Sequence, residues 1–313
     1  LIMLMKHSTI KLDGFLEEAK KMLSFSIPLT ISSIFGSIVN NFSVLYLSFF
    51  FLPSVVGLYG IASKIGTYID LVTGSISAIL IPMFSAALAS REISKKLGNL
   101  YNYSIYFGLL FAMPIVVYVS IFSNAMVVSV FTSTYKGSSI YMALIGIGIL
   151  VGLLASYASS LAISSGYIRE VFKYGVLVSL AELLSFLVLI PFFGVTGLII
   201  SIYYIGSIIA NILYLHFVSK KLHLKIQINL SRLVASNIVL ALLLLPIAIP
   251  NIRATYQLLL GLIVLFFIYP ALLGLFKAIS NKELELLRKI VIKLPIFGNW
   301  LNALIIYAEI FQR

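Results

Sequence analysis

Three ionisable side chains lie inside apolar segments of this sequence: Lys64, Asp70 and Glu182. A charge at the centre of a membrane helix costs about 2.5 to 3.5 kcal/mol on insertion scales, so these groups should face protein or water rather than lipid. Lys64 could bind an anionic group such as a phosphate. Asp70 and Glu182 could hold a coupling ion or a proton, or could act as counter-charges to a basic residue.

The spacing of the charges limits how they can pair. Lys64 and Asp70 are six residues apart, hence about 120° apart around an α-helix, which makes them poor partners for each other. A structural ion pair between Lys64 and Glu182 is the alternative to a functional role for both.

The charges share helical faces with small and polar residues, because side chains three or four positions apart lie on one side of a helix. Four segments show such a face: Ser33, Ser37, Asn40 and Ser48; Ser63, Gly66, Asp70, Thr73 and Ser77; Gly175, Ser179, Glu182 and Ser185; Gly197, Ser201, Tyr204 and Asn211. They favour a shared interior that contains water, although hydrogen bonds between helices in a dry bundle would give the same pattern. We predict substrate contacts at Lys64, Ser37, Asn40, Tyr204 and Asn211.

The composition is that of a membrane protein, because 61% of the residues are hydrophobic and 10% are charged, against about 25% charged in globular domains. The sequence has no cysteine, and its three histidines lack metal-ligand spacing. No Ser-His-Asp set, carboxylate pair or nucleotide loop can be assembled, so we expect no enzyme, metal or cofactor. The net charge of +12 is scattered over short connectors, which does not favour nucleic-acid binding.

Apolar windows predict an all-α polytopic protein with eight transmembrane helices. They cover Phe25–Phe51, Val56–Ala87, Tyr101–Phe122, Ser139–Ala162, Tyr174–Phe193, Val195–Val218, Leu233–Ile249 and Tyr256–Phe276. Placing the N-terminus in the cytoplasm leaves only Lys136 and Arg253 in outer connectors and Lys64 in a span, with the other Lys and Arg residues inside. The positive-inside rule therefore predicts that both termini are cytoplasmic.

The segment LIPFFGVTGLIIS (189–201) interrupts a long apolar run with Pro191, Gly194 and Gly197. We predict a tight external hairpin, because Pro cannot continue the helical hydrogen bonding and Gly relieves the turn. The alternative is a kink in one helix from Gly175 to Val218, but that helix would be about 66 Å long, more than a bilayer spans.

The remaining patterns concern packing and the chain ends. Small residues recur every fourth position at Gly148, Gly152, Ser156 and Ser160, which predicts close helix packing. Residues 1–22 suit an amphipathic cytoplasmic lead-in, and residues 280–313 an interfacial amphipathic tail that starts with a capping box, Ser280 with Glu283. Because the chain starts with Leu, we expect that it begins within a longer protein.

Several segments together resemble the polysaccharide and oligosaccharide flippases, in the superfamily that also holds the multidrug and toxin extruders and the lipid II flippases. The similar segments are FSIPLTISSIFGSIVN, VGLYGIASKIGTYI, LAISSGYIRE, LIPFFGVTGLIIS and KELELLRKIVIKLP. Lys64 falls where such flippases often carry a basic residue, whereas Glu182 falls where a polar amide is more usual. The resemblance implies two six-helix lobes around a central cavity, with residues 23–218 as the second lobe, 219–279 as an extra helix pair, and a first lobe missing.

The resemblance also implies a function: moving a polyprenyl-phosphate-linked saccharide from the inner to the outer leaflet of the cell membrane. Lys64 would attract the phosphate in the low-dielectric cavity. One alternative is an ion-coupled extruder of cationic compounds, which Asp70 and Glu182 would suit. The other is a non-transporting scaffold for glycan assembly. Besides the bilayer and the lipid-linked substrate, the expected partners are a first lobe, a second copy of the chain, or glycan-assembly proteins.

Overall fold

The computed structural model describes residues 15–89, 93–224, 229–249 and 252–279, together with a few positions near the C-terminus. In these residues the chain is helical, with short connections. The helices are α2 (Phe15–Phe50), α3 (Pro53–Leu88), α4 (Ile93–Phe131), α5 (Ser138–Ser164), α6 (Ile168–Ile199), α7 (Ser207–Lys221), α8 (Ser231–Ala248) and α9 (Ala254–Leu275), with a 3₁₀ turn at Ser133–Tyr135 and a π-helix, η2, at Ile200–Gly206.

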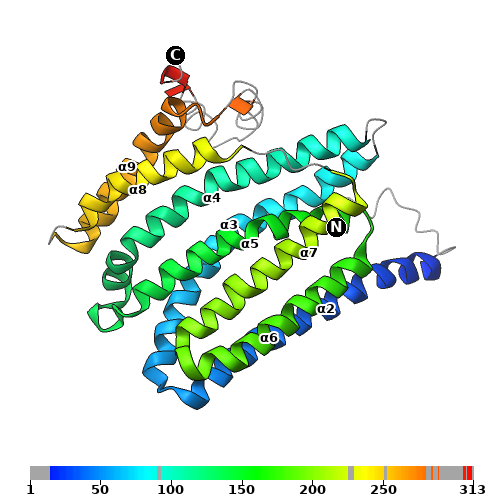
Figure 1. Cartoon of the computed structure of the whole chain (residues 1–313), viewed down its shortest axis with the longest axis horizontal. Helices are drawn as coiled ribbons and strands as arrows, with labels where there is room; N and C mark the ends of the chain where they lie inside the picture. The colour runs from blue at the N-terminus through cyan, green and yellow to red at the C-terminus, as the bar shows by residue number, and fades with distance from the viewer. Residues whose placement is uncertain are drawn as a thin grey trace, which may run out of the picture.

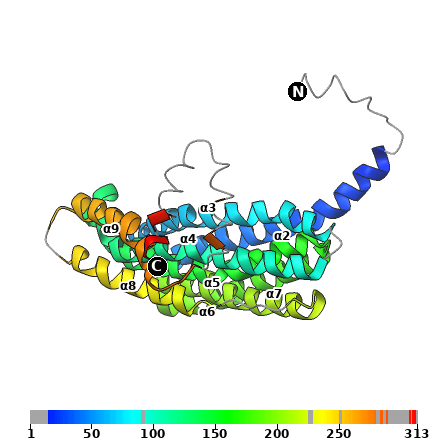
Figure 2. The ribbon, with the colours of Figure 1, turned by 90° about the horizontal axis from the view of Figure 1, so that it is seen from above.

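The helices lie side by side with α5 at the centre of the array (Figure 1). Helix α5 packs against α3, α4 and α7, while α2 packs mainly on α6 at one edge and the α8–α9 pair packs on α4 at the other. Seen from above, the array is flattened, and α2 projects beyond it toward the N-terminus (Figure 2). The α8–α9 pair thus lies at the edge of the array and contacts it through α4.

Seven continuous helical segments are long and apolar enough to cross a membrane, so this is a multi-pass membrane protein. One of them, Ile168–Lys221, has 54 residues and would measure roughly 81 Å if it were straight. It is not straight, because α6 and the return through η2 and α7 lie antiparallel in Figure 1. Counted by crossings, the described chain gives the eight predicted helices.

The reversal occurs at Gly194, whose φ of 55° and ψ of −130° are not helical. Residues with a side chain rarely adopt this backbone conformation. Gly197 then packs against the descending arm: a Cβ added to it would lie 2.6 Å from the carbonyl carbon of Leu189 and 3.1 Å from the nitrogen of Ile190. The predicted hairpin is confirmed, and the kinked single helix is excluded.

The helices extend further than the apolar windows. Helix α2 starts at Phe15 and runs unbroken into the first span, and α4 starts at Ile93 rather than near Tyr101. A helix ends where its backbone bonding ends, whereas a hydropathy window ends where the charges begin. Residues 1–14, Ser280 and most of the predicted tail lie outside the described residues.

Helix α2 is much less covered than its neighbours. Only 6% of its most apolar window is buried, against 61% in α4. Its large apolar side chains Ile31, Ile38 and Phe49 are at least half exposed. Most of the α2 surface therefore faces away from the described chain.

Candidate functional site

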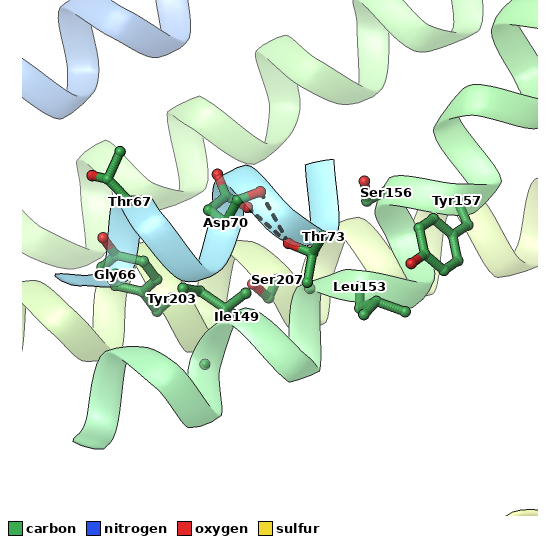
Figure 3. Close-up of a pocket in the computed structure, with 12 residues that line it drawn as sticks. Gly66, Thr67, Asp70, Thr73, Ile149, Leu153, Ser156, Tyr157, Tyr203 and Ser207 are labelled. Atoms are coloured by element: carbon green, nitrogen blue, oxygen red, sulfur yellow. Dashed lines mark hydrogen bonds between the residues drawn. The ribbon is translucent and has the colours of Figure 1, made fainter. Parts of the chain in front are cut away.

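After the reversal at Gly194 the chain runs back through residues 195–221, which include η2 and α7 and which we call the return segment. A cavity of about 230 Å³ lies between α3, α5 and the return segment. Figure 3 shows its lining side chains, which come from three elements that are distant in the sequence. They are Gly66, Thr67, Asp70 and Thr73 of α3; Gly148, Ile149, Gly152, Leu153, Ser156 and Tyr157 of α5; and Tyr203 and Ser207 of the return segment. We call this cavity the Asp70 pocket.

Asp70 is the one carboxylate in the lining of the Asp70 pocket. The hydroxyl of Thr73 lies 3.4 Å from Asp70 Oδ1 and 3.1 Å from the Asp70 carbonyl oxygen (Figure 3). Asp70 and Thr67 are exposed, whereas Thr73 is buried. The carboxylate thus stands at the open side of the pocket, among hydroxyl groups and without a basic residue in the lining.

Two glycines of α5 allow the return segment to come close enough to form a wall. A Cβ on Gly148 would lie 2.5 Å from Tyr203 Cβ, and a Cβ on Gly152 would lie 3.0 Å from the hydroxyl of Ser207. The hydroxyls of Tyr203 and Tyr59 form a side-chain hydrogen bond, and Tyr203 lies within electrostatic range of Asp70. The small-residue spacing of α5 therefore brings η2 against the pocket.

One residue that lines the Asp70 pocket, Tyr157, has a buried hydroxyl without a partner among the described residues. Tyr157 is fully buried, and its hydroxyl oxygen has no hydrogen-bond partner in the described part of the chain. Its ring packs where a side chain on Gly108 would be, since a Cβ there would lie 2.7 Å from Tyr157 Cζ. An unpartnered polar group in a pocket is suited to a water or another small polar ligand.

Lys64 is exposed on α3 and is not part of the lining. Among the described residues, the salt bridges are Lys221–Glu170 and Arg288–Glu309. The structural ion pair between Lys64 and Glu182 is therefore absent from this structure.

Ser37 and Asn40 are exposed on α2. Ser37 lines a shallow surface groove of about 480 Å³ together with Ser33 and Asn41. Asn40 contributes its backbone carbonyl to a hydrogen bond from Ser43. Neither residue reaches the Asp70 pocket.

Tyr204 and Asn211 make hydrogen bonds between helices instead. The Tyr204 hydroxyl donates to the carbonyl of Leu144 at 2.8 Å, and Asn211 Nδ2 donates to the carbonyl of Val151 at 2.6 Å. Tyr204 and Asn211 are seven residues apart, and so are their partners Leu144 and Val151. Two parallel helices repeat their contacts at this spacing. The polar face that contains Tyr204 and Asn211 therefore forms hydrogen bonds between helices and does not line a water-filled interior.

Glu182 does not line the Asp70 pocket either. Two other residues on the same face of α6 contact α2. Gly175 lies against Ser32, and the Ser179 hydroxyl lies 3.6 Å from a Cβ placed on Gly36. The Glu182 side chain itself packs on Gly206, the last residue of η2. The four polar faces therefore do not meet in one interior as we predicted, because two of them are used for packing helices together.

Sequence reasoning missed Tyr203, Ser207 and Tyr157. The sequence pattern selects Tyr204 because α-helical periodicity from Gly197 leads to it. In the structure that face meets α5 through Tyr204 and Asn211, and the neighbouring residue Tyr203 lines the pocket. Nothing in the segment ISIYYIG marks a π-helix in advance.

Comparisons with known proteins agree with this architecture. The family described as polysaccharide biosynthesis protein matches residues 1–140. No curated protein gives a significant match. The solved structure of the lipid II flippase MurJ in an inward closed conformation is similar, with a TM-score of 0.63 and 16% identity over 85% of this chain and 56% of the flippase chain.

A MOP superfamily transporter from Pyrococcus furiosus, described as having a binding pocket of reversed polarity, is also similar. Its TM-score is 0.52 at 16% identity, over 92% of this chain and 62% of the transporter chain. The chain thus spans less than two thirds of each solved transporter. The chain shares the fold of these two solved proteins, and its first 140 residues match the polysaccharide biosynthesis family, in agreement with the resemblance found in the sequence.

Proposed function

We propose that the chain forms one lobe of a flippase that moves a polyprenyl-phosphate-linked oligosaccharide or polysaccharide repeat unit from the inner to the outer leaflet of the cell membrane. The observation that carries the proposal is Lys64, an exposed cation within a membrane helix that forms no salt bridge in the described chain. The match to a polysaccharide biosynthesis family and the fold shared with a lipid II flippase support it.

Lys64 is suited to a phosphate. An ammonium group in a low-dielectric setting attracts an anion far more strongly than it does in water. A cation inside a membrane helix that is not used in an ion pair is a functional-site candidate by default. Ser37 and Asn40 on the exposed side of α2 supply hydroxyl and amide groups for the saccharide.

The Asp70 pocket supplies the coupling step in this proposal. Its single carboxylate, hydroxyl groups and lack of a basic residue suit a proton or a monovalent cation, since hard cations take oxygen ligands. Binding there would bias rocking of the lobe against a partner lobe.

Orientation and partners follow from the charges and the exposed helix. The start of α4, the start of α6 and the end of α7 lie at one end of the array, and the α4–α5 and α8–α9 connections lie at the other (Figure 1). By sequence position the first set of helix ends carries Lys96, Arg169, Lys173 and Lys220, and the two connections carry Lys136 and Arg253. This distribution supports cytoplasmic termini. The uncovered surface of α2 is available to a first lobe, to a second copy of the chain or to glycan-assembly proteins.

Two other functions would use the same features differently. An ion-coupled cation extruder would bind its substrate at Asp70, and a scaffold for glycan assembly would bind proteins and transport nothing. Each predicts a different ligand for the purified chain, so ligand binding distinguishes them.

The test is native mass spectrometry of the detergent-purified chain with a polyprenyl-phosphate-linked saccharide. We expect retention that is reduced about tenfold by Lys64→Ala, the factor that corresponds to the loss of one charge-assisted contact. Lys136→Ala, which removes an exposed lysine from a connector, is the matched control. Equal retention of the uncharged polyprenol-linked saccharide by the unmodified chain would contradict the role of Lys64, and retention of lipophilic cations alone would favour the extruder.

A further inference from the structure

Glu182 lies in the middle of a membrane helix and needs a physical role. It belongs to none of the salt bridges found among the described residues, and it does not line the Asp70 pocket. Its carboxylate is directed at the backbone of Gly206: a Cβ there would overlap Oε1 and would lie 2.8 Å from Cγ and 2.9 Å from Cδ. The Glu182 side chain thus fills the space that a side chain at position 206 would need.

Gly206 is the last residue of the π-helix η2, and Ser207 begins α7. π-helices account for well under 1% of residues and are mostly single turns inside α-helices, often beside functional sites. Here the π-helix carries Tyr203, and the next residue after it is Ser207. These two residues are the whole contribution of the return segment to the lining of the Asp70 pocket.

Returning η2 to α-helical bonding would change this wall. A shift from i→i+5 to i→i+4 bonding rotates the residues before and after it relative to each other. Tyr203 would then leave its contact with Gly148 and its hydrogen bond with Tyr59, or Ser207 would leave Gly152. The wall therefore depends on whatever holds the π register.

We propose that Glu182 is a positioning residue for the Asp70 pocket: its side chain packs on Gly206 and holds η2 in the π register that presents Tyr203 and Ser207 to Asp70. The role depends on the shape of the Glu182 side chain and not on its charge. The inference concerns the pocket itself and holds whichever substrate the chain moves.

The proposed role predicts different outcomes for two substitutions of Glu182. Glu182→Gln keeps the volume and removes the charge, so it preserves the wall. Glu182→Ala removes Cγ and Cδ and loosens the wall. Gly206→Ala places a methyl group in the space of Cγ and Cδ, so Glu182 must change rotamer rather than shift its tip. In the double variant Glu182→Ala with Gly206→Ala, the new methyl occupies the vacated space and restores the packing.

The chain contains no cysteine, so one introduced thiol reports on the wall without further changes. Ser207→Cys places that thiol in the pocket lining, and methyl methanethiosulfonate is a small neutral reagent that enters apolar sites. Ser219→Cys, exposed near the end of the same helix α7, is the control. Labelling rates are measured in the full chain in proteoliposomes, for each variant at position 182 or 206, and need no transport assay.

We expect Ser207→Cys to be labelled at the same rate with Glu182 and with Glu182→Gln. The rate should change about tenfold in Glu182→Ala and in Gly206→Ala, as expected when a local opening equilibrium loses one packing contact, and it should return in the double variant. Ser219→Cys should be labelled equally throughout.

Other results overturn the inference. If Glu182→Gln is labelled like Glu182→Ala, the charge and not the shape is what matters. If Glu182→Ala leaves the rate unchanged, Glu182 holds nothing in place. Should Gly206→Ala fail to fold, which Ser219→Cys labelling and size-exclusion chromatography reveal, the Gln and Ala variants at position 182 decide the question by themselves. Failure of the proposed flippase activity would leave these rates unaffected.

Discussion

The hydroxyl oxygens of Ser77 and Ser156 lie 2.6 Å apart and join α3 to α5 at the edge of the Asp70 pocket, which Ser156 also lines. Four residues further along α5, the Ser160 hydroxyl adds a second link, because it donates to the carbonyl of Ser77 at 3.1 Å. The face of α5 that was expected to allow close packing therefore also bonds to its neighbour, which fixes the distance between two walls of the pocket.

Removing the two hydroxyls tests how much the Ser77–Ser156 hydrogen bond contributes to stability. We expect Ser77→Ala and Ser156→Ala to couple by about 0.6 kcal/mol, and by no more than about 1.7 kcal/mol, the range of interhelical hydrogen bonds in membranes. A double-mutant cycle of unfolding in detergent measures the coupling, with Ser219→Ala as a control outside the contact. Strictly additive effects would mean that the two hydroxyls do not depend on each other.

The hairpin glycines should be intolerant of a methyl group. Gly194→Ala forces a side chain into a backbone conformation that costs of order 1 to 3 kcal/mol, and Gly197→Ala places a methyl group against the backbone of Leu189. We expect both to lower the thermal unfolding temperature in detergent.

Gly57→Ala is the matched control, because a Cβ there meets nothing within 4 Å. Alanine is favoured over glycine within a helix by about 0.5 to 1 kcal/mol, so this variant should unfold at the same or a slightly higher temperature. A Gly197→Ala protein as stable as Gly57→Ala would show that the two arms of the hairpin can separate without cost.

Cation binding at the Asp70 pocket should appear as ligand-dependent stability. A ligand that binds only the folded state adds about 2.7 kcal/mol at a concentration a hundred times its dissociation constant. We expect Na⁺ or acidic pH to raise the unfolding temperature of the unmodified chain, and Asp70→Asn to remove the effect. Glu17→Gln, at an exposed site near the start of α2, should retain it. Stabilisation that survives in Asp70→Asn would move the site elsewhere.

Hydropathy and turn chemistry were enough to predict the spans and the hairpin, because both are local. Pro191 and Gly194 mark the reversal, and the cost of a charge in a membrane helix singles out Asp70 without knowledge of the fold. The neighbours of Asp70 could not be predicted, since they come from α5 and the return segment. Tyr203 was missed in favour of Tyr204 because the sequence pattern groups Tyr204 with Asn211, and only the contacts show that this pair bonds to α5 while Tyr203 lines the pocket.

The polar faces were the least informative pattern. Serine and glycine on a membrane helix serve close packing as readily as they serve a wet cavity. Only the contacts distinguish Gly175 and Ser179, which meet α2, from Thr67 and Thr73, which meet the pocket.

The π-helix has a consequence for length as well as for shape. An i→i+5 turn contains one residue more than the α-helix around it needs. Deleting a single residue within Ile200–Gly206, a change that puts an ordinary membrane helix out of phase with its neighbours, would here convert the turn to α-helix and leave Tyr214 and Phe217 facing as before. The return helix therefore contains one residue more than an α-helix would need. That extra residue lies in η2, the segment that places Tyr203 in the wall of the pocket.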